Sequence, residues 1–224
     1  MDRYYDERLS GERLRRCYEI APPRILQYLL AEVEFAVGQV RGARSVLELG
    51  CGYGRVLQEL AAVASLAVGC DTSRKSLELA RAHLRPRRNI ALVRTDAARL
   101  AFRANVFEAV VCIQNGISAF GVDRRELVSE AVRVAMPGGR ILFSSYAPDL
   151  WEERLAWFRL QAEEGLVGEI DEAKTGHGVI VCRDGFRAST VDGAEFSRLF
   201  GGLRVRTEVQ GVDRSSLFCI AAKE

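Results

Sequence analysis

The segment 46–56, VLELGCGYGRV, constrains the fold of this chain more than any other part of the sequence. A short apolar run ends at Leu49, a glycine-rich turn follows, and a helical pattern begins near Gly54. Gly50 and Gly52 allow the backbone to turn sharply and to approach a ligand closely. The helix that follows presents free N–H groups and a positive dipole end. The segment therefore predicts a buried strand, a ligand-binding turn and a helix.

Asp71 ends the next apolar run, in the sequence AVGCDTS. An acidic residue about 20 positions after the first glycine is placed to accept hydrogen bonds from ribose hydroxyls. A simple helix-cap role for Asp71 is the alternative, and Thr72 or Ser73 can also cap the following helix. A dinucleotide site has the pattern GxGxxG or GxGxxA, and Arg55 stands at its third position here. An arginine there would obstruct close packing of helix on strand, which argues against a nicotinamide oxidoreductase.

From residue 45 onward, short apolar runs alternate with helical stretches. The expected strands are 46–49, 66–70, 90–93, 109–113 and 141–144, and the expected helices lie around 54–64, 74–84 and 123–135. Continuously apolar strands separated by helices indicate a parallel sheet covered on both faces. Two C-terminal strands joined near Asp213 should pair antiparallel, because their connection is short. The expected class is α/β with a doubly wound sheet.

Together with Asp96-Ala97, these motifs resemble those of the class I S-adenosylmethionine-dependent methyltransferases. That family has an acidic residue before GxGxG, matched by Glu48, and an acidic end of the second strand, matched by Asp71. The segments 107–120 and 136–146 are similar to its fourth strand and to its turn into strand five. The resemblance implies a Rossmann-like, mostly parallel seven-stranded sheet with an antiparallel C-terminal strand and a small cap insertion. It also implies S-adenosylmethionine as cofactor and S-adenosylhomocysteine as product.

The resemblance further implies roles for single residues. The backbone of the glycine turn would hold the methionine part, with Glu48 orienting the loop or binding the amino group. Asp71 would bind the ribose, Asp96 and the Ala97 N–H would bind adenine, and the region of Gln114 would face the sulfonium. The expected cofactor-binding residues are Glu48, Gly50, Cys51, Gly52, Gly54, Asp71, Thr72, Asp96, Ala97 and Gln114.

Two segments have no place in the alternating sheet. We expect residues 1–40 to form an N-terminal helical lid and 147–190 to form a cap insertion, around a methyltransferase domain of 41–146 and 191–224. Both carry apolar residues, so we expect them to cover the cofactor site and to enclose a pocket on the order of a few hundred Å³. Docking at the far end of the sheet, or in a dimer contact, is the alternative. Residues 3–19 resemble an exposed charged helix, and a hairpin turn is expected at 174–178.

The expected acceptor is a small molecule. Methyl transfer needs chiefly in-line positioning and exclusion of water, and it needs a general base only for a protonated nucleophile. Weak candidates for that base are Tyr5, Tyr146 and His177. The segment 114–117, QNGI, lacks the proline motif of amino-group methyltransferases that act on bases, which counts against DNA and many RNA bases. RNA or protein methylation, or S-adenosylmethionine binding without catalysis, are the alternatives.

Composition and charge limit which binding partners and which cellular compartment are expected. The formal net charge of +2 gives no global reason to expect a nucleic acid or a membrane surface. The arginines within 13–16 and 81–88 are interpreted as solvated faces. No apolar run approaches the roughly 20 residues of a transmembrane helix, and the N-terminal stretch has no signal-peptide core. The six cysteines show no metal-ligand spacing, so no metal is expected, and most should be buried and reduced. We expect a cytoplasmic monomer or homodimer.

Overall fold

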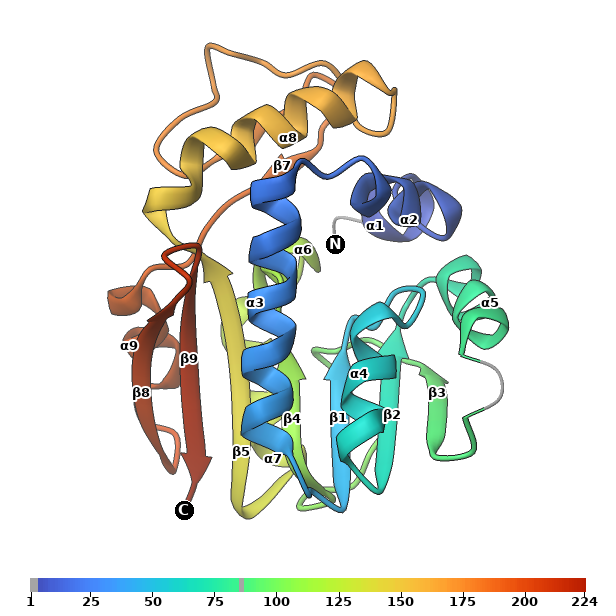
Figure 1. The fold of residues 1–224 in the computed structure, drawn as a ribbon. Helices are drawn as coiled ribbons and strands as arrows, with labels where there is room; N and C mark the ends of the chain where they lie inside the picture. Colours follow the sequence, from blue (N-terminus) through green and yellow to red (C-terminus); the bar gives the residue numbers. More distant parts are fainter. Residues whose placement is uncertain (1–3, 85–86) are drawn as a thin grey trace.

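The computed structural model describes residues 4–84 and 87–224, so residues 1–3 of the predicted lid and Arg85 lie outside the described residues. Figure 1 shows the elements in their spatial arrangement. In chain order they are α1 (Tyr4–Glu7), α2 (Glu12–Glu19), α3 (Pro23–Val40), β1 (Ser45–Leu49), α4 (Arg55–Val63), β2 (Leu66–Asp71), α5 (Arg74–His83), β3 (Ile90–Arg94), β4 (Phe107–Cys112), α6 (Gly116–Ala119), α7 (Arg124–Val134), β5 (Ala135–Tyr146), η1 (Pro148–Leu150), α8 (Trp151–Glu163), β6 (Ile180–Val181), β7 (Arg187–Ala188), α9 (Gly193–Phe200), β8 (Val205–Val212) and β9 (Ser216–Lys223).

A seven-stranded sheet forms the middle layer, in the order β3-β2-β1-β4-β5-β9-β8. The strands from β1 to β5 pair parallel to one another. β9 pairs antiparallel with both β5 and β8. The doubly wound, mostly parallel sheet with an antiparallel C-terminal strand is therefore confirmed. The turn between β8 and β9 contains Asp213 and Arg214, whose φ angles of 53° and 55° produce a tight reversal.

Helices cover both faces of this sheet. Successive β1 residues point to opposite faces, so Val46 belongs to the apolar cluster that contains residues of α3 and α4, whereas Leu47 belongs to the cluster that contains residues of α7 and α9. Both side chains are fully buried. Figure 1 shows α3 and α4 in front of the strands and α7 behind them. All six cysteines are buried free thiols, as expected for small apolar side chains.

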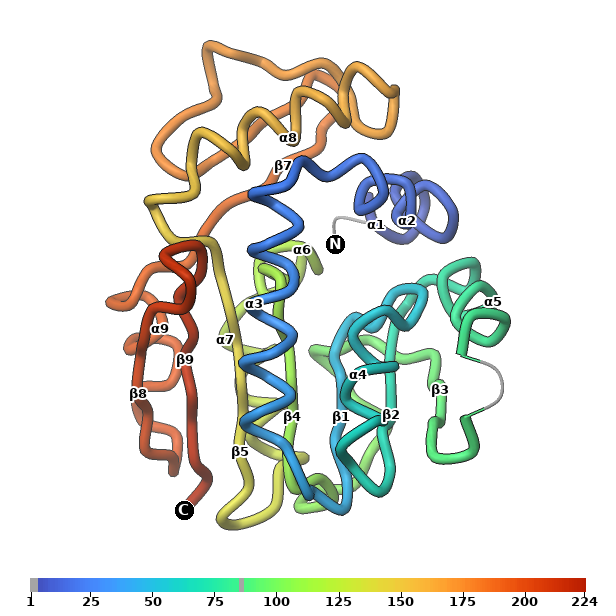
Figure 2. The backbone as a smooth tube through the Cα atoms, viewed as in Figure 1, coloured from blue at the N-terminus to red at the C-terminus, as the bar shows by residue number. Residues whose placement is uncertain are grey.

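A separate apolar cluster joins the N-terminal helices to the insertion after β5. It combines residues of α1, α2, the first half of α3, α8, β6 and β7. Figure 2 traces the chain as it leaves β5, crosses above the sheet as α8, and returns to α9. The expected exposed helix over 3–19 is wrong in two respects. It is divided at Ser10-Gly11 into two helices, and Leu9 and Cys17 are only 2% and 3% exposed.

The insertion contains the predicted turn at 174–178 and a short antiparallel strand pair, β6 with β7, that the sequence did not predict. His177 and Gly178 have φ angles of 49° and 79°, and they reverse the chain between Gly176 and Val179. The pairing of β6 with β7 lies further along the chain, around 182–186. Within the described part of the chain, none of the helices combines the length and the apolar composition of a transmembrane span.

Candidate functional site

A cavity of about 510 Å³ lies at the carboxyl ends of the parallel strands. The loops after β1, β2, β3 and β4 contribute one part of its wall, and α1, α2, α8 and the end of β5 contribute another. β1 lies between β2 and β4. The chain therefore continues from β1 towards β2 and β3 on one side, and from β4 towards β5 on the other. Such a topological switch point is where open α/β sheets bind ligands.

The glycine-rich turn after β1 is held by the neighbouring strand. The N–H groups of Gly50 and Cys51 both donate to the carbonyl oxygen of Cys70, at 2.8 and 2.9 Å. Gly50 has a φ of 71°, and a Cβ there would lie 2.4 Å from a ring carbon of Phe120. Gly54 caps α4 in the left-handed region, with a φ of 90°. The backbone of this turn therefore requires glycine, as its sequence predicted.

Asp71 is fixed by the same turn. Its Oδ2 accepts from the Gly52 N–H at 2.9 Å, and its Oδ1 accepts from the Ser73 N–H at 2.8 Å. The cap of α5 is the Ser73 hydroxyl, which accepts from the Ser76 N–H at 3.3 Å. Each Asp71 oxygen keeps a lone pair for a ligand. Burial raises the pKa of the Asp71 carboxyl, and the two backbone N–H groups oppose that rise.

Glu48 and Arg55 place a buried carboxyl and a guanidinium beside the turn. Glu48 is 5% exposed, and its Oε2 has no hydrogen-bond partner among the described residues. Burial raises the pKa of the Glu48 carboxyl to about 8, against the opposing charge of Arg55 and with a smaller contribution from Asp71. The Arg55 guanidinium donates to the Gln114 side-chain oxygen and lies 4.6 Å from the Tyr18 ring centroid. Its Nε is buried without a partner in the described chain.

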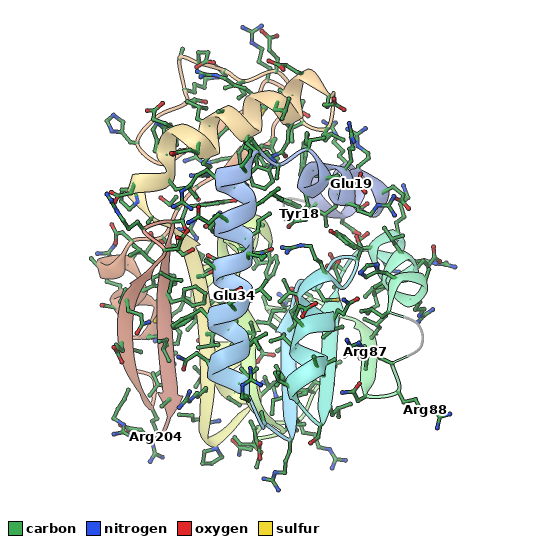
Figure 3. The ribbon with its side chains drawn as sticks, viewed as in Figure 1. Tyr18, Glu19, Glu34, Arg87, Arg88 and Arg204 are labelled. Atoms are coloured by element: carbon green, nitrogen blue, oxygen red, sulfur yellow. The ribbon has the colours of Figure 1, made fainter. Side chains whose placement is uncertain are left out.

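Arg55 is a cavity-lining residue that the sequence did not predict as part of the site. The same holds for the lining residues of α2 and α8, namely Tyr18, Trp157, Phe158 and Gln161. The dinucleotide pattern makes Arg55 only an obstacle, yet its side chain lines the cavity. Its position was a usable signal, because the first residue of α4 follows Gly54 at the carboxyl edge of the sheet. Figure 3 shows Tyr18 on the underside of α2, facing the space above α4.

The third and fourth loops complete the sheet side of the cavity. The Asp96 Oδ1 accepts from the Ala98 N–H at 2.8 Å, which orders the loop after β3. The Gln114 N–H donates to Glu32 Oε2 at 2.6 Å and to the Ser144 hydroxyl at 2.8 Å. Of the predicted cofactor residues, all but Gly54 line the cavity: Glu48, Gly50, Cys51, Gly52, Asp71, Thr72, Asp96, Ala97 and Gln114.

The three candidate bases are placed differently. Tyr5 and Tyr146 line the cavity, whereas His177 is exposed in its tight turn and is not among the lining residues. Burial raises the pKa of both tyrosine hydroxyls above the ordinary value, so at neutral pH they donate hydrogen bonds rather than accept protons.

The N-terminal helices and the insertion bind each other above the cavity. The Trp157 Nε1 on α8 donates to the Cys17 carbonyl at 2.9 Å. The Tyr4 hydroxyl donates to Asp184 Oδ2 at 2.5 Å, and its ring contacts Phe186 at 5.0 Å between centroids. These contacts join segments that are far apart in the sequence into one covering layer.

Comparison with known proteins agrees with this fold and matches the segment that carries the motifs. Residues 46–139 match the family model described as a methyltransferase domain. The chain is 35% identical over 112 residues to a demethylmenaquinone methyltransferase of Clavibacter sepedonicus, covering 50% of this chain and 44% of that relative. It thus spans less than half of that relative's length.

Two solved structures share the fold. Magnesium protoporphyrin IX methyltransferase from Synechocystis PCC 6803, with bound S-adenosylhomocysteine, superposes with a TM-score of 0.64 at 20% identity, covering 99% of this chain and 97% of that one. A SAM-dependent methyltransferase from Aquifex aeolicus gives a TM-score of 0.64 at 12% identity, covering 93% and 97%. The family match, the motifs and the shared fold together identify residues 46–139 as a methyltransferase domain of the class I S-adenosylmethionine-dependent type. The cofactor expected from the motifs is the one that this family uses.

Proposed function

We propose that the protein transfers a methyl group from S-adenosylmethionine to a small-molecule acceptor. The observation that supports this most is the meeting of the glycine turn, Asp71 and Asp96-Ala97 at one cavity, beneath helices from both additional segments. In this proposal residues 1–40 act as a lid and 147–190 as a cap, around a cofactor domain of 41–146 and 191–224. The acceptor would enter between the lid, the cap and the sheet loops.

The cavity residues fit the parts of the cofactor. Asp71 has free lone pairs for two ribose hydroxyls, and Asp96 with the Ala97 N–H would hold the adenine. The unpartnered Glu48 carboxyl suits the amino group of the methionine part, and the unpartnered Nε of Arg55 suits its carboxylate. When bound, S-adenosylmethionine supplies a methyl group already activated by a sulfonium. The protein then needs chiefly to orient the acceptor and to exclude water.

The arginine clusters give little support to RNA or protein as the acceptor. Arg15 and Arg16 on α2 form ion pairs with Glu12, Glu19 and Glu164. Figure 3 shows Arg87 and Arg88 at the outer edge of the molecule beside β3, with Arg88 directed away from the cavity side. A macromolecular acceptor would instead require a basic surface that continues to the cavity mouth.

The acceptor class can be tested with methyl-labelled S-adenosylmethionine. The protein would be incubated with a cell extract that has been separated into low-molecular-mass compounds, RNA and protein. We expect the label to appear in the low-molecular-mass fraction, and we expect the Asp71→Ala variant to transfer much less label than the wild type when S-adenosylmethionine is limiting. Label confined to RNA or protein would contradict the small-molecule proposal while leaving the methyltransferase activity intact.

Cofactor binding should release a proton from Glu48. With a pKa of about 8, this carboxyl is mostly protonated at pH 7 in the free protein. A bound ammonium beside it favours the ionised form, so its pKa falls and its proton leaves. Calorimetry of S-adenosylhomocysteine binding, in buffers of different ionisation enthalpy, should show this release between about pH 6 and pH 8. Glu48→Gln should abolish it, and equal proton release by variant and wild type would assign the titration to another group.

A further inference from the structure

The part of the cavity formed by the lid, the cap and the end of β5 is rich in aromatic side chains. Its aromatic residues are Tyr5, Tyr18, Tyr146, Trp157 and Phe158. They come from α1, α2, the end of β5 and α8. Flat aromatic walls stack well on a planar ligand, and they also attract cations. The charges around these rings decide between the two possibilities.

Arg154 places a buried positive charge directly behind this wall. It is 1% exposed, and its guanidinium carbon lies 4.3 Å from the Tyr146 ring centroid and 5.7 Å from that of Phe158. Its NH1 and NH2 donate to the carbonyl oxygens of Gly178 and Ala188, at 3.0 and 3.1 Å. Both partners are neutral, and burial lowers the pKa of Arg154. Arg154 forms no ion pair with the residues that the structure describes, and a buried charge of this kind favours a nearby anion.

Glu32 on α3 is a buried carboxyl whose charge raises the pKa of Tyr146. It does not neutralise Arg154. Its Oε2 is occupied by the Gln114 N–H and the Ser144 hydroxyl, at 2.6 and 2.8 Å. Burial raises its pKa to about 7, so at neutral pH it is only partly ionised. Asp6 also lines the cavity, and its charge raises the pKa of Asp71, which places it towards the ribose end.

Gln161 adds a specific hydrogen-bond donor to the same wall. It is 2% exposed, lies on α8 one turn after Trp157, and lines the cavity. Its side-chain Nε2 is buried without a hydrogen-bond partner among the described residues. An unpaired buried amide is costly, and a ligand oxygen at this position would satisfy it.

We propose that the lid and cap bind a planar aromatic acceptor bearing an ionised oxygen, a carboxylate or an acidic phenol, which stacks on the aromatic wall and accepts a hydrogen bond from Gln161. The inference rests on the proposed methyltransferase function. A lone pair of the oxygen forms the new O–CH₃ bond, and the electrons of the broken C–S bond stay on sulfur, which becomes a neutral thioether. No proton is released in this step. It therefore needs no base, in agreement with tyrosine hydroxyls that remain protonated.

A cationic acceptor is disfavoured by the same arrangement. Guanidinium groups already lie over the rings of Tyr146 and Tyr18. A protonated amine would be repelled by Arg154, and it would also have to lose its proton before it could accept a methyl group.

The test uses matched aromatic compounds with protein saturated with S-adenosylhomocysteine. Calorimetry would compare benzoate and 2-naphthoate with benzylamine and 2-naphthylmethylamine. We expect the better carboxylate to bind at least about tenfold more tightly than its amine, and Gln161→Leu to weaken it by about tenfold. Arg159→Gln is the matched control, because Arg159 lies on the same helix but is exposed and bonds Glu172. The control should bind like the wild type.

Three results would overturn the inference: tighter binding of the amines, an unchanged carboxylate affinity in Gln161→Leu, or no binding of either carboxylate at millimolar concentration. A folded Arg154→Met variant should also bind the carboxylates more weakly. If that variant fails to fold, Gln161→Leu still decides the test. S-adenosylhomocysteine affinity is measured first and should be equal in wild type, Gln161→Leu and Arg159→Gln. Failure of the wild type to bind it would instead contradict the proposed function itself.

Discussion

Replacing Trp157 with alanine should lower the free energy of unfolding by about 3–5 kcal/mol. Trp157 is 4% exposed and is the point where α8 meets the N-terminal helices. Its indole donates to the Cys17 carbonyl, and its ring contacts Tyr18 and Phe158 at 6.2 and 5.7 Å between centroids. The variant would lose this apolar contact and leave the Cys17 carbonyl unpaired inside the covering layer.

Urea unfolding followed by circular dichroism measures this loss. Trp151→Ala is the control, because Trp151 lies on the same helix but is only half-buried, and it should cost clearly less. Limited proteolysis should also cleave the Trp157→Ala variant sooner, within the N-terminal helices. Equal unfolding midpoints for the two variants would show that Trp157 does not join lid and cap.

Asp71→Ala should weaken S-adenosylhomocysteine binding by about 1.5–3 kcal/mol, because hydrogen bonds to a charged carboxylate are lost. The dissociation constant would rise by roughly 10- to 150-fold. The structure adds a stability cost to this expectation, since Asp71 also accepts from the Gly52 and Ser73 N–H groups. Part of the effect therefore comes from loosening the turn, and a melting curve separates the two contributions.

Asp192→Ala provides the matched control for Asp71→Ala. Asp192 is an exposed aspartate that caps α9 by accepting from the Glu195 N–H at 2.7 Å. Its loss should cost about 1 kcal/mol of stability and leave cofactor affinity unchanged. If Asp71→Ala behaved in the same way, Asp71 would serve the turn alone and the ribose would be bound elsewhere.

The cofactor side of the molecule could be predicted because its signals are local. The glycine turn needs positive φ angles at fixed positions, and the buried strands are short, mostly apolar runs followed by a loop, as β2 is at Asp71. Parallel packing then brings these loop residues together at one edge of the sheet. Arg55 was not predictable from the dinucleotide pattern, because that pattern concerns the size of the side chain at this position and not its charge.

The N-terminal helices and the insertion after β5 were less predictable, because their contacts are distant in sequence. Residues 3–19 alternate charges and have few apolar side chains, which favours an exposed helix when taken alone. The partners that bury Tyr4 and Cys17 are Phe186 and Trp157, which lie in the insertion. The break at Gly11 likewise follows from tertiary packing, because its N–H donates to the Ser76 hydroxyl at 3.0 Å.

The central claim is that the cavity binds S-adenosylmethionine and its demethylated product rather than a dinucleotide. Titration calorimetry of the wild-type protein with S-adenosylhomocysteine and with NAD tests it most directly. We predict saturable binding of S-adenosylhomocysteine at one site per chain and no detectable binding of NAD. Comparable NAD affinity, together with no heat from S-adenosylhomocysteine, would contradict it.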